Sequence, residues 1–364
     1  MKRSSKHITP HAALRRLPAI ALALVLAICC TGVEYGPLLQ PETSRLRFNF
    51  DWSEAGSRDS ARPSVMPVAM ARMVSEIHYL WDTENFYCPD SHVNRVGNGE
   101  YFLVTFAPST GCESYDFSLV DRFLKHREMS VDSLVAELIP YDADSLKKLF
   151  GRAVVESDYT RQTVIPEAGH LYSTTARESI YFDADGGDIL VSFSPLDRTQ
   201  LLSFTVDIQT ESGVQIDSVT ADITGTPRRV GLMSGALDSK DVCKTYFRMQ
   251  RASSRYEGSV RVLGLFTSNF TEYIYGAGVI RLTIFARCED KEQVVQVSLN
   301  IKELIDDAGI MKASDDNLVW TIACAEATID VDKTLTISKE LIMNGNEDCL
   351  VDWVLASHTI DEDI

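Results

Sequence analysis

The stretch Leu46-Arg-Phe48-Asn-Phe50-Asp-Trp52 alternates strictly between apolar and polar residues. Successive side chains of a β-strand point to opposite faces, so the apolar side chains of this stretch would all lie on one face. The pattern is typical of a strand that is buried on one face only. Such a strand needs a second layer of structure to cover its apolar face. The stretch therefore predicts a layered, β-rich protein.

Short segments that fit strands recur on both sides of Gly186-Gly187. Before these glycines, strands are predicted over 69–81 and over 100–107, the second after the turn Gly97-Asn-Gly99. After them, about nine short segments separated by turn residues favour a β-sandwich. The nine segments are residues 189–193, 202–208, 214–223, 230–233, 261–266, 279–286, 295–301, 318–323 and 334–337.

Between residues 117 and 150 the apolar spacing changes to three or four residues, which is typical of helices. Asp142 or Asp144 can cap the last helix and Gly151 can end it. We therefore expect a short helical insertion in a mainly β protein. The apolar positions fall into three groups: Leu119, Phe123 and Leu124; Leu134, Leu138 and Ile139; Leu146, Leu149 and Phe150.

The chain begins with a basic leader and a short apolar run, residues 17–28, that stops at Cys29-Cys30. This arrangement predicts an export signal. A membrane-spanning helix needs about 20 apolar residues, more than this run offers, and Pro18 lies near its start. A lipoprotein signal is preferred over an ordinary secretory signal because a cysteine stands at the predicted cleavage point. Acylation of its thiol would tether the mature chain to a membrane. Cys30 is the predicted lipidation site, with Cys29 as the alternative, because Cys29 is a smaller preceding residue than Ile28.

Charge argues against nucleic acid and anionic lipid headgroups as partners. The chain of 364 residues has a net charge of −17, and its leader holds five of the 35 basic residues and none of the 52 acidic ones. With 30 basic against 52 acidic residues, the mature chain stands at about −22. We expect a signal peptide over 1–29, a tether over 30–43, a first domain with the helical insertion over 44–175, a second domain over 176–345 and a tail over 346–364.

Six cysteines remain after the predicted lipidation site, and an even number in an exported protein permits disulfides. Their order favours Cys88–Cys112 in the first domain and two further bonds among the other four. Free buried thiols are the alternative. The absence of a close CxxC pair argues against a zinc or redox site. The six candidates are Cys88, Cys112, Cys243, Cys288, Cys324 and Cys349.

The sequence offers no pattern of residues that supports catalysis. Beyond the leader, its histidines are scattered, without HExxH or paired spacing, and no GxSxG or phosphate-binding loop occurs. The acidic pairs at Asp183-Ala-Asp185 and Asp315-Asp316 lack the ligand count of a calcium loop and are interpreted as solvated turns. We therefore expect no enzyme, no cofactor and no metal.

The order of these features resembles the fimbrillin-like lipoproteins of Bacteroides and Porphyromonas relatives, in particular the minor-fimbrium anchor subunits of type V pili. The resemblance covers roughly residues 29–340. It rests on the leader followed by Leu46-Arg-Phe-Asn-Phe-Asp-Trp52, on the strand Gly99-Glu-Tyr-Phe-Leu-Val-Thr-Phe106, on the segments 191–195, 206–208 and 219–225, and on Val295-Gln-Val-Ser-Leu-Asn-Ile-Lys-Glu-Leu304.

The resemblance implies an outer-membrane lipoprotein with two tandem transthyretin-like, Greek-key β-sandwich domains. Its function would be to anchor, cap or seed a fimbrium, with fimbrial subunits as partners through β-strand addition. A polymerising stalk or tip adhesin is one alternative; such subunits are trimmed by an arginine-specific protease, and Arg45, Arg47, Arg58 and Arg62 are available. A glycan-binding surface lipoprotein that uses Trp81, Tyr87, Trp320 or Trp353 is the other.

Overall fold

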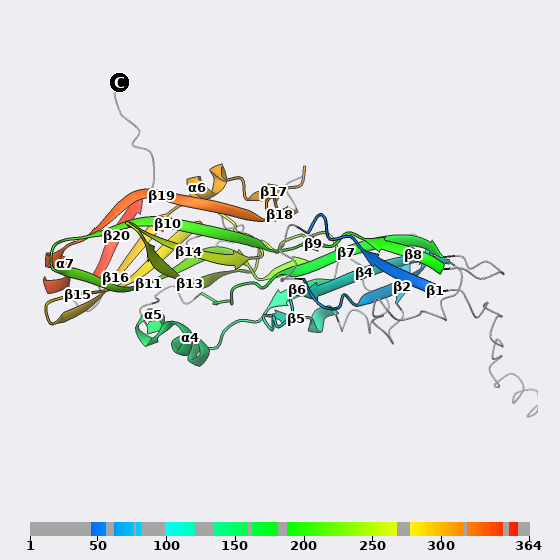
Figure 1. The fold of residues 1–364 in the computed structure, drawn as a ribbon, viewed down its shortest axis with the longest axis horizontal. Helices are drawn as coiled ribbons and strands as arrows, with labels where there is room; N and C mark the ends of the chain where they lie inside the picture. Colours follow the sequence, from blue (N-terminus) through cyan, green and yellow to red (C-terminus); the bar gives the residue numbers. More distant parts are fainter. Residues whose placement is uncertain are drawn as a thin grey trace, which may run out of the picture.

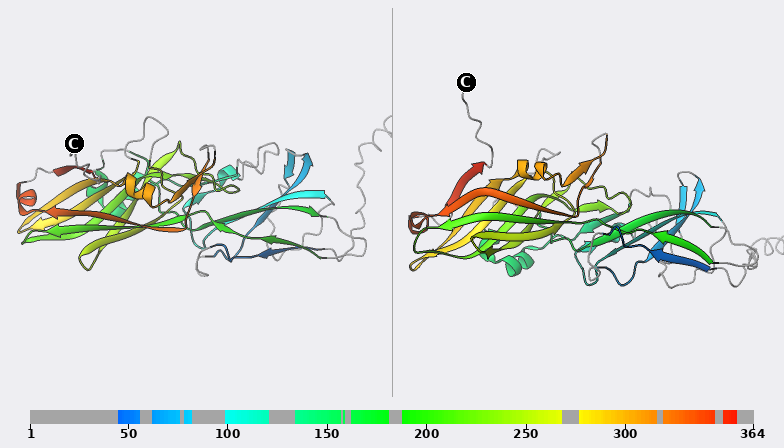
Figure 2. Two further views of the ribbon diagram at one scale, coloured as in Figure 1. Left: turned by 90° about the horizontal axis from the view of Figure 1, so that it is seen from above. Right: turned by 45° about the horizontal axis from the view of Figure 1, so that its top comes forward.

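The computed structural model describes residues 45–55, 62–75, 78–81, 99–120, 134–156, 158, 162–180, 188–267, 277–315, 319–344 and 349–355. The predicted leader, with Cys29 and Cys30, lies outside these residues. The protein is mainly β, as the sequence predicts. Figure 1 shows an elongated molecule in which two groups of sheets follow one another end to end, and Figure 2 shows the same arrangement from two further sides.

The first group consists of a five-stranded sheet in the order β3-β2-β4-β7-β9 and a two-stranded sheet, β1-β8. A first core fills the space between them, with Leu46 and Phe48 of β1 against Met70 of β2 and Leu103 of β4. The strands are β1 (Arg45–Phe50), β2 (Val68–Ser75), β3 (His78–Trp81), β4 (Gly99–Pro108), β7 (Leu171–Ile180), β8 (Asp188–Phe193) and β9 (Leu196–Asp197).

The second group is an eight-stranded sheet in the order β19-β10-β14-β13-β11-β15-β16-β20. It is folded over on itself at β13, which pairs with β11 over most of its length and with β14 only from Gln250 to Ala252. The strands are β10 (Gln200–Thr210), β11 (Val214–Pro227), β13 (Val242–Ala252), β14 (Arg255–Val262), β15 (Val279–Cys288), β16 (Lys291–Asn300), β19 (Glu326–Ile337) and β20 (Cys349–Leu355).

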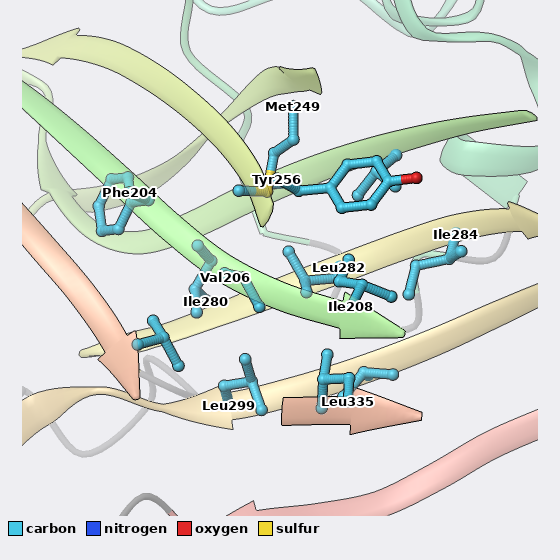
Figure 3. Close-up of a cluster of buried hydrophobic side chains, with 14 of the residues drawn as sticks. Phe204, Val206, Ile208, Met249, Tyr256, Ile280, Leu282, Ile284, Leu299 and Leu335 are labelled. Atoms are coloured by element: carbon cyan, nitrogen blue, oxygen red, sulfur yellow. The ribbon is translucent and has the colours of Figure 1, made fainter. Parts of the chain in front are cut away.

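The second core lies between the two layers that this fold creates. Phe204, Val206 and Ile208 of β10 lie over Ile280 and Leu282 of β15, as Figure 3 shows. Every second residue of β10 from Leu202 to Ile208 is buried, and those between them are half-buried. The alternation in the sequence therefore produces a strand with one face toward the core.

A third apolar cluster joins the two groups. It brings Phe102, Val104 and Phe106 of β4 together with Leu232 and Leu263 from the second half of the chain. The small sheet β12-β6-β5 crosses the same region. Its strands are β5 (Tyr115–Asp116), β6 (Val135–Leu138) and β12 (Arg229–Gly231).

A connecting segment, residues 163–168, lies between β13 and β14 where these strands separate. The amide of Ile165 donates to the carbonyl of Lys244 at 2.9 Å, and the amide of Lys244 donates to the carbonyl of Thr163 at 3.1 Å. On the other side the amide of Ala168 donates to the carbonyl of Arg261 at 2.8 Å. The segment thus supplies main-chain partners to both strands.

The helical insertion forms only in part. Helix α4 (Ala143–Phe150) begins after Asp142, whose side chain accepts from the amides of the first turn, and ends at Gly151, which has a φ of 94°. Both signals were predicted. Helices α5 (Arg152–Glu156), α6 (Lys302–Asp307) and α7 (Lys339–Asn344) are also present. Within the described residues, no helix is long and apolar enough to cross a membrane.

The predicted helix around Leu134, Leu138 and Ile139 is wrong. This segment forms β6, which pairs with β12 and β5. Leu134 and Leu138 are fully buried in the third cluster. Their spacing of four also fits a strand, in which every second residue faces the same side. Pairing with β12 and β5 favours the strand over the helix. Of the predicted helix at Leu119, Phe123 and Leu124, residues 118–120 are helical and the rest lies outside the described residues.

Several boundaries differ from the expected ones. Residues 69–81 form two antiparallel strands, β2 and β3. Strand β7 crosses the boundary predicted after residue 175, and β8 pairs with β1, so the first group of sheets extends to Asp197. The predicted tail contains β20, which pairs with β16. The remaining strands are the hairpin β17 (Met311–Ala313) and β18 (Trp320–Ile322).

The second core predicts a strong effect of truncating Phe204, which is fully buried. We expect Phe204→Ala to lower the free energy of unfolding by about 3–5 kcal/mol, because it leaves a cavity among well-packed side chains. Urea denaturation would measure this change. The matched control is Leu190→Ala, at a side chain that is 61% exposed, with an expected change within about 0.5 kcal/mol. Equal effects of the two substitutions would contradict this placement of the core.

Candidate functional site

Strand β1 is held by one neighbouring strand. It pairs in parallel with β8 in six consecutive positions, from Arg45 opposite Asp188 to Phe50 opposite Phe193. The amide of Asp51 adds a hydrogen bond of 2.8 Å to the carbonyl of Phe193. Since β1 and β8 form a sheet of two strands, the other edge of β1 has no strand partner among the described residues. The chain enters β1 at the outer end of the molecule (Figure 1).

The apolar side chains of β1 fill a slot in the first group of sheets. We define the β1 slot by Met70, Leu103, Val191 and Phe193, which lie in the first core with Leu46 and Phe48 of β1. Leu46 is fully buried and Phe48 is 9% exposed. The ring centroid of Phe193 lies 6.0 Å from that of Phe48 and 5.4 Å from that of Phe50, the latter pair stacked. Burying a Leu or Phe side chain stabilises a fold by about 1.5–3 kcal/mol, so these contacts hold much of the strand in place.

The opposite face of β1 is polar. Arg47 and Asn49 are exposed, as the alternating sequence predicts. Asp51 follows the strand and accepts a hydrogen bond of 3.0 Å from the amide of Ser53, which lowers the pKa of its carboxyl group. Charged side chains along an exposed edge discourage uncontrolled pairing with other strands.

Trp52 fixes the point at which the chain leaves β1. Its ring contacts Tyr172 edge-on, with centroids 5.3 Å apart. The guanidinium group of Arg62 lies over the Trp52 ring at 5.3 Å from its centroid. A cation placed over an indole face is attracted by it. The strand therefore has a defined end, and the chain that follows returns across it.

The four arginines predicted as cleavage sites lie at different places relative to β1. Arg45 begins the strand and Arg47 lies within it, whereas Arg62 follows it and Arg58 falls outside the described residues. A cut after Arg58 or Arg62 would separate the whole of β1 from the rest of the chain. A cut after Arg45 would leave the strand in place, and a cut after Arg47 would divide it.

Four of the predicted disulfide cysteines are free thiols in the structure: Cys112, Cys243, Cys288 and Cys324. Cys243 lies opposite Thr226 near one end of β11, and Cys288 lies opposite Val214 at the other end. Twelve residues of strand span about 40 Å, whereas a disulfide needs Cα atoms about 4.4–6.8 Å apart. Cys243 and Cys288 are therefore too far apart to be bonded to each other.

Cys324 lies beside the start of β10, whereas Cys288 lies opposite Val214, just beyond the other end of β10, so these two cysteines are also far apart. The side-chain amide of Gln200, at the start of β10, donates to the Cys324 carbonyl at 2.8 Å and to its sulfur at 3.3 Å. Burial raises the pKa of the Cys243 thiol to about 12, so this thiol stays protonated at neutral pH. Since Cys112 is a free thiol, the structure does not contain the predicted bond Cys88–Cys112. Cys88 itself lies outside the described residues, so any other pairing of Cys88 stays a prediction, and so does pairing through the side chain of Cys349.

Among the described residues, the other sequence candidates form no cluster of metal-ligating side chains. His170 pairs through Nδ1 with a carboxylate oxygen of Asp197 at 2.5 Å, and its ring stacks on that of Tyr172. In the part of the chain that the structure describes, no group of three or more His, Cys, Asp or Glu could hold a metal ion. Of the aromatic residues considered for glycan binding, Trp320 lines a small cleft with Phe266 and Asp306. Tyr87 lies outside the described residues.

No protein-family model matches the sequence, and no curated protein sequence matches it. Solved structures do match. A proposed adhesin from Bacteroides ovatus is 14% identical with a TM-score of 0.46, over 81% of this chain and 92% of that chain. A proposed polysaccharide binding protein from Bacteroides thetaiotaomicron is 14% identical with a TM-score of 0.41, over 81% of this chain and 92% of that one. The fimbrial anchor protein Mfa2 from Porphyromonas gingivalis is 11% identical with a TM-score of 0.36, over 66% of this chain and 77% of that one.

These neighbours carry the names of a proposed adhesin, a proposed polysaccharide binding protein and a fimbrial anchor protein.

The β1 slot predicts that shortening Phe48 loosens this strand. We expect Phe48→Ala to increase hydrogen exchange at the amides of β1 and β8 more than at those of β11 and β15, because the second core is untouched. The free energy of unfolding should fall by about 3–5 kcal/mol. Asn49→Ala, at the neighbouring exposed position, is the control and should leave exchange unchanged. Uniform acceleration of exchange through the whole chain would argue against a separately held strand.

Proposed function

We propose that this chain is a non-enzymatic outer-membrane lipoprotein that anchors, caps or seeds a fimbrium at the cell surface through β-strand addition. The observation that carries the proposal is the β1 slot. Among the described residues, it combines one main-chain partner strand, β8, with buried positions for alternate side chains of the strand that occupies it. These are the two requirements of β-strand addition, in which main-chain hydrogen bonds give affinity and side-chain pockets give specificity.

The proposed anchor keeps β1 in its own slot. Its tether and lipid then stay joined to the folded body, because β1 follows the predicted tether directly. Fully extended, the tether over 30–43 would reach about 45–50 Å, at about 3.3–3.6 Å per residue. A filled slot also leaves the fimbrial partner to pair with another edge, such as β19 or β20 of the eight-stranded sheet.

The alternative function is a polymerising stalk or tip subunit, and the position of the arginines supports it. Removal of β1 by a cut after Arg58 or Arg62 would expose Val191, Phe193 and Leu103 to water. An exposed apolar slot beside an unpaired strand accepts a strand from a neighbour. The two functions thus differ in whether β1 remains attached.

Loss of the lipid should release the fimbria. We expect Cys30→Ala combined with Cys29→Ala to move fimbriae from the cell surface into the medium, because the membrane anchor depends on acylation of a thiol. Electron microscopy of cells and quantification of fimbriae in the supernatant would measure the release. Each single substitution is the control that assigns the lipidated residue. Fimbriae that stay on cells carrying the double substitution would contradict the anchor function.

Sequencing the N-terminus of the surface protein distinguishes the anchor from the stalk. For the anchor we expect the mature chain to begin at Cys30 or Cys29 and to retain β1. For the stalk we expect it to begin after Arg58 or Arg62, and Arg58→Gln with Arg62→Gln should then abolish polymerisation. A matched control is Arg47→Gln, which lies within β1 and should leave that cut unaffected.

A further inference from the structure

A charged cluster lies on the face of the eight-stranded sheet that is turned away from the second core. Asp222 of β11 lies opposite Tyr246 of β13 and opposite Arg281 of β15. Lys244 precedes Tyr246 by two residues on β13 and so shares its face, diagonal to Asp222. Charged side chains are seldom fully buried unless they have partners. The exposed fractions here are 0% for Lys244, 1% for Asp222 and 3% for Arg281.

The fourth charged residue comes from the helical insertion. Asp158 follows α5 and forms an ion pair through Oδ2 with Nζ of Lys244, 86 positions along the chain. The hydroxyl of Tyr246 donates to the same Oδ2 at 3.0 Å. Nη1 of Arg281 donates to the other oxygen, Oδ1, at 3.1 Å. These three contacts of the carboxyl group are all made with residues of the sheet.

Helices α4 and α5 pack beside the cluster. Leu146 and Val154 pack with Val164 and Tyr246, and the ring of Phe150 lies 5.2 Å from that of Tyr246. Figure 1 shows both helices beside β11 and β13. The amine of Lys244, whose side chain is fully buried, and the carboxyl group of Asp158, whose side chain is 10% exposed, are thus held in contact. Holding two reacting groups in contact replaces a bimolecular encounter with an intramolecular step.

We propose that Lys244 and Asp158 form an intramolecular isopeptide bond, with Asp222 as the proton acceptor. The product is an amide between Nζ of Lys244 and Cγ of Asp158. It fastens the helical insertion covalently to the sheet.

The step balances without any other reactant. A proton passes from the ammonium group of Lys244 to the carboxylate of Asp158, and the neutral amine attacks Cγ. Asp222 takes a proton from the nitrogen and returns it to the departing Oδ2, which leaves as water. The N–C bond forms, a C–O bond breaks, and nothing is oxidised or reduced. Arg281 faces Oδ1, where negative charge develops, and such donors stabilise a tetrahedral intermediate.

Burial favours the protonation states that this step requires. Desolvation lowers the pKa of Lys244, which makes its neutral amine more accessible. Desolvation also raises the pKa of Asp222, which suits it to take up a proton and return it. Tyr246, whose pKa desolvation raises, stays protonated and can donate to the leaving oxygen.

The charges that remain after the reaction are matched. Arg281 and Asp222 pair through Nε at 2.8 Å and through Nη2 at 2.7 Å, and neither takes part in the new bond. The amide replaces two buried charges with a neutral group, and buried charges carry a desolvation cost of several kcal/mol each.

Mass spectrometry of the full chain tests the bond. The denatured protein should be lighter than its sequence by one water molecule, and a digest should contain one branched peptide that joins the segments around Asp158 and Lys244. This measurement needs no variant, so it does not depend on whether a substituted chain folds. A chain of full mass, with both segments recovered only as linear peptides, would show a plain ion pair and overturn the proposal.

Variants separate the roles of the three residues. Lys244→Met and Asp158→Ala should abolish the branched peptide, whereas Asp158→Asn should still form it and lose ammonia instead of water. Proton transfer by a positioned group is typically worth about 10²–10⁴-fold, so Asp222→Asn should lower the yield of branched peptide by about tenfold or more, and Asp222→Glu should restore part of it. Asp217→Asn, at an exposed ion pair on the same strand, is the control and should leave the bond intact. Unchanged yield in Asp222→Asn would overturn the role of Asp222.

Discussion

The second half of the molecule depends on one strand that belongs to both layers of its core. Because β13 pairs first with β11 and then with β14, one sheet can fold over and bury Phe204 against Phe247 and Met249. An apolar sheet face must be covered, and here the sheet covers itself. The separation of β13 from β14 leaves main-chain groups that residues 163–168 satisfy, so the connection between the two halves also completes the sheet.

The two groups of sheets are joined by more than a linker. Strand β4 is buried on both faces, with Leu103 toward the β1 slot and Phe102 and Val104 toward the third cluster. Strand β6, from the first half of the sequence, pairs with β12 from the second half. The order of the chain and the order in space therefore differ, which explains why a boundary drawn along the sequence separates strands that pair with each other.

Sequence patterns predicted the strands whose two faces differ most in polarity. Strands β1 and β10 alternate so regularly that their burial follows directly from their residues. Strand β13 also alternates, but Lys244 and Tyr246 on its second face are buried by the helices, and a single sequence does not show that a polar face will be covered. The partner of each strand could not be predicted from the sequence either. Strand β1 pairs with a strand more than a hundred residues away, and a local pattern of residues does not specify that choice.

The direction of β1 would have a mechanical consequence if the chain is tethered by its N-terminus, as proposed above. The chain enters β1 at the outer end of the molecule, and β1 and β8 run in parallel toward the middle (Figure 1). A force applied through the tether therefore acts lengthwise along the strand and loads its hydrogen bonds in shear, all at the same time. A force perpendicular to the strand would instead break those hydrogen bonds one after another. The topology thus places the six residues of β1 in a geometry that resists such tension.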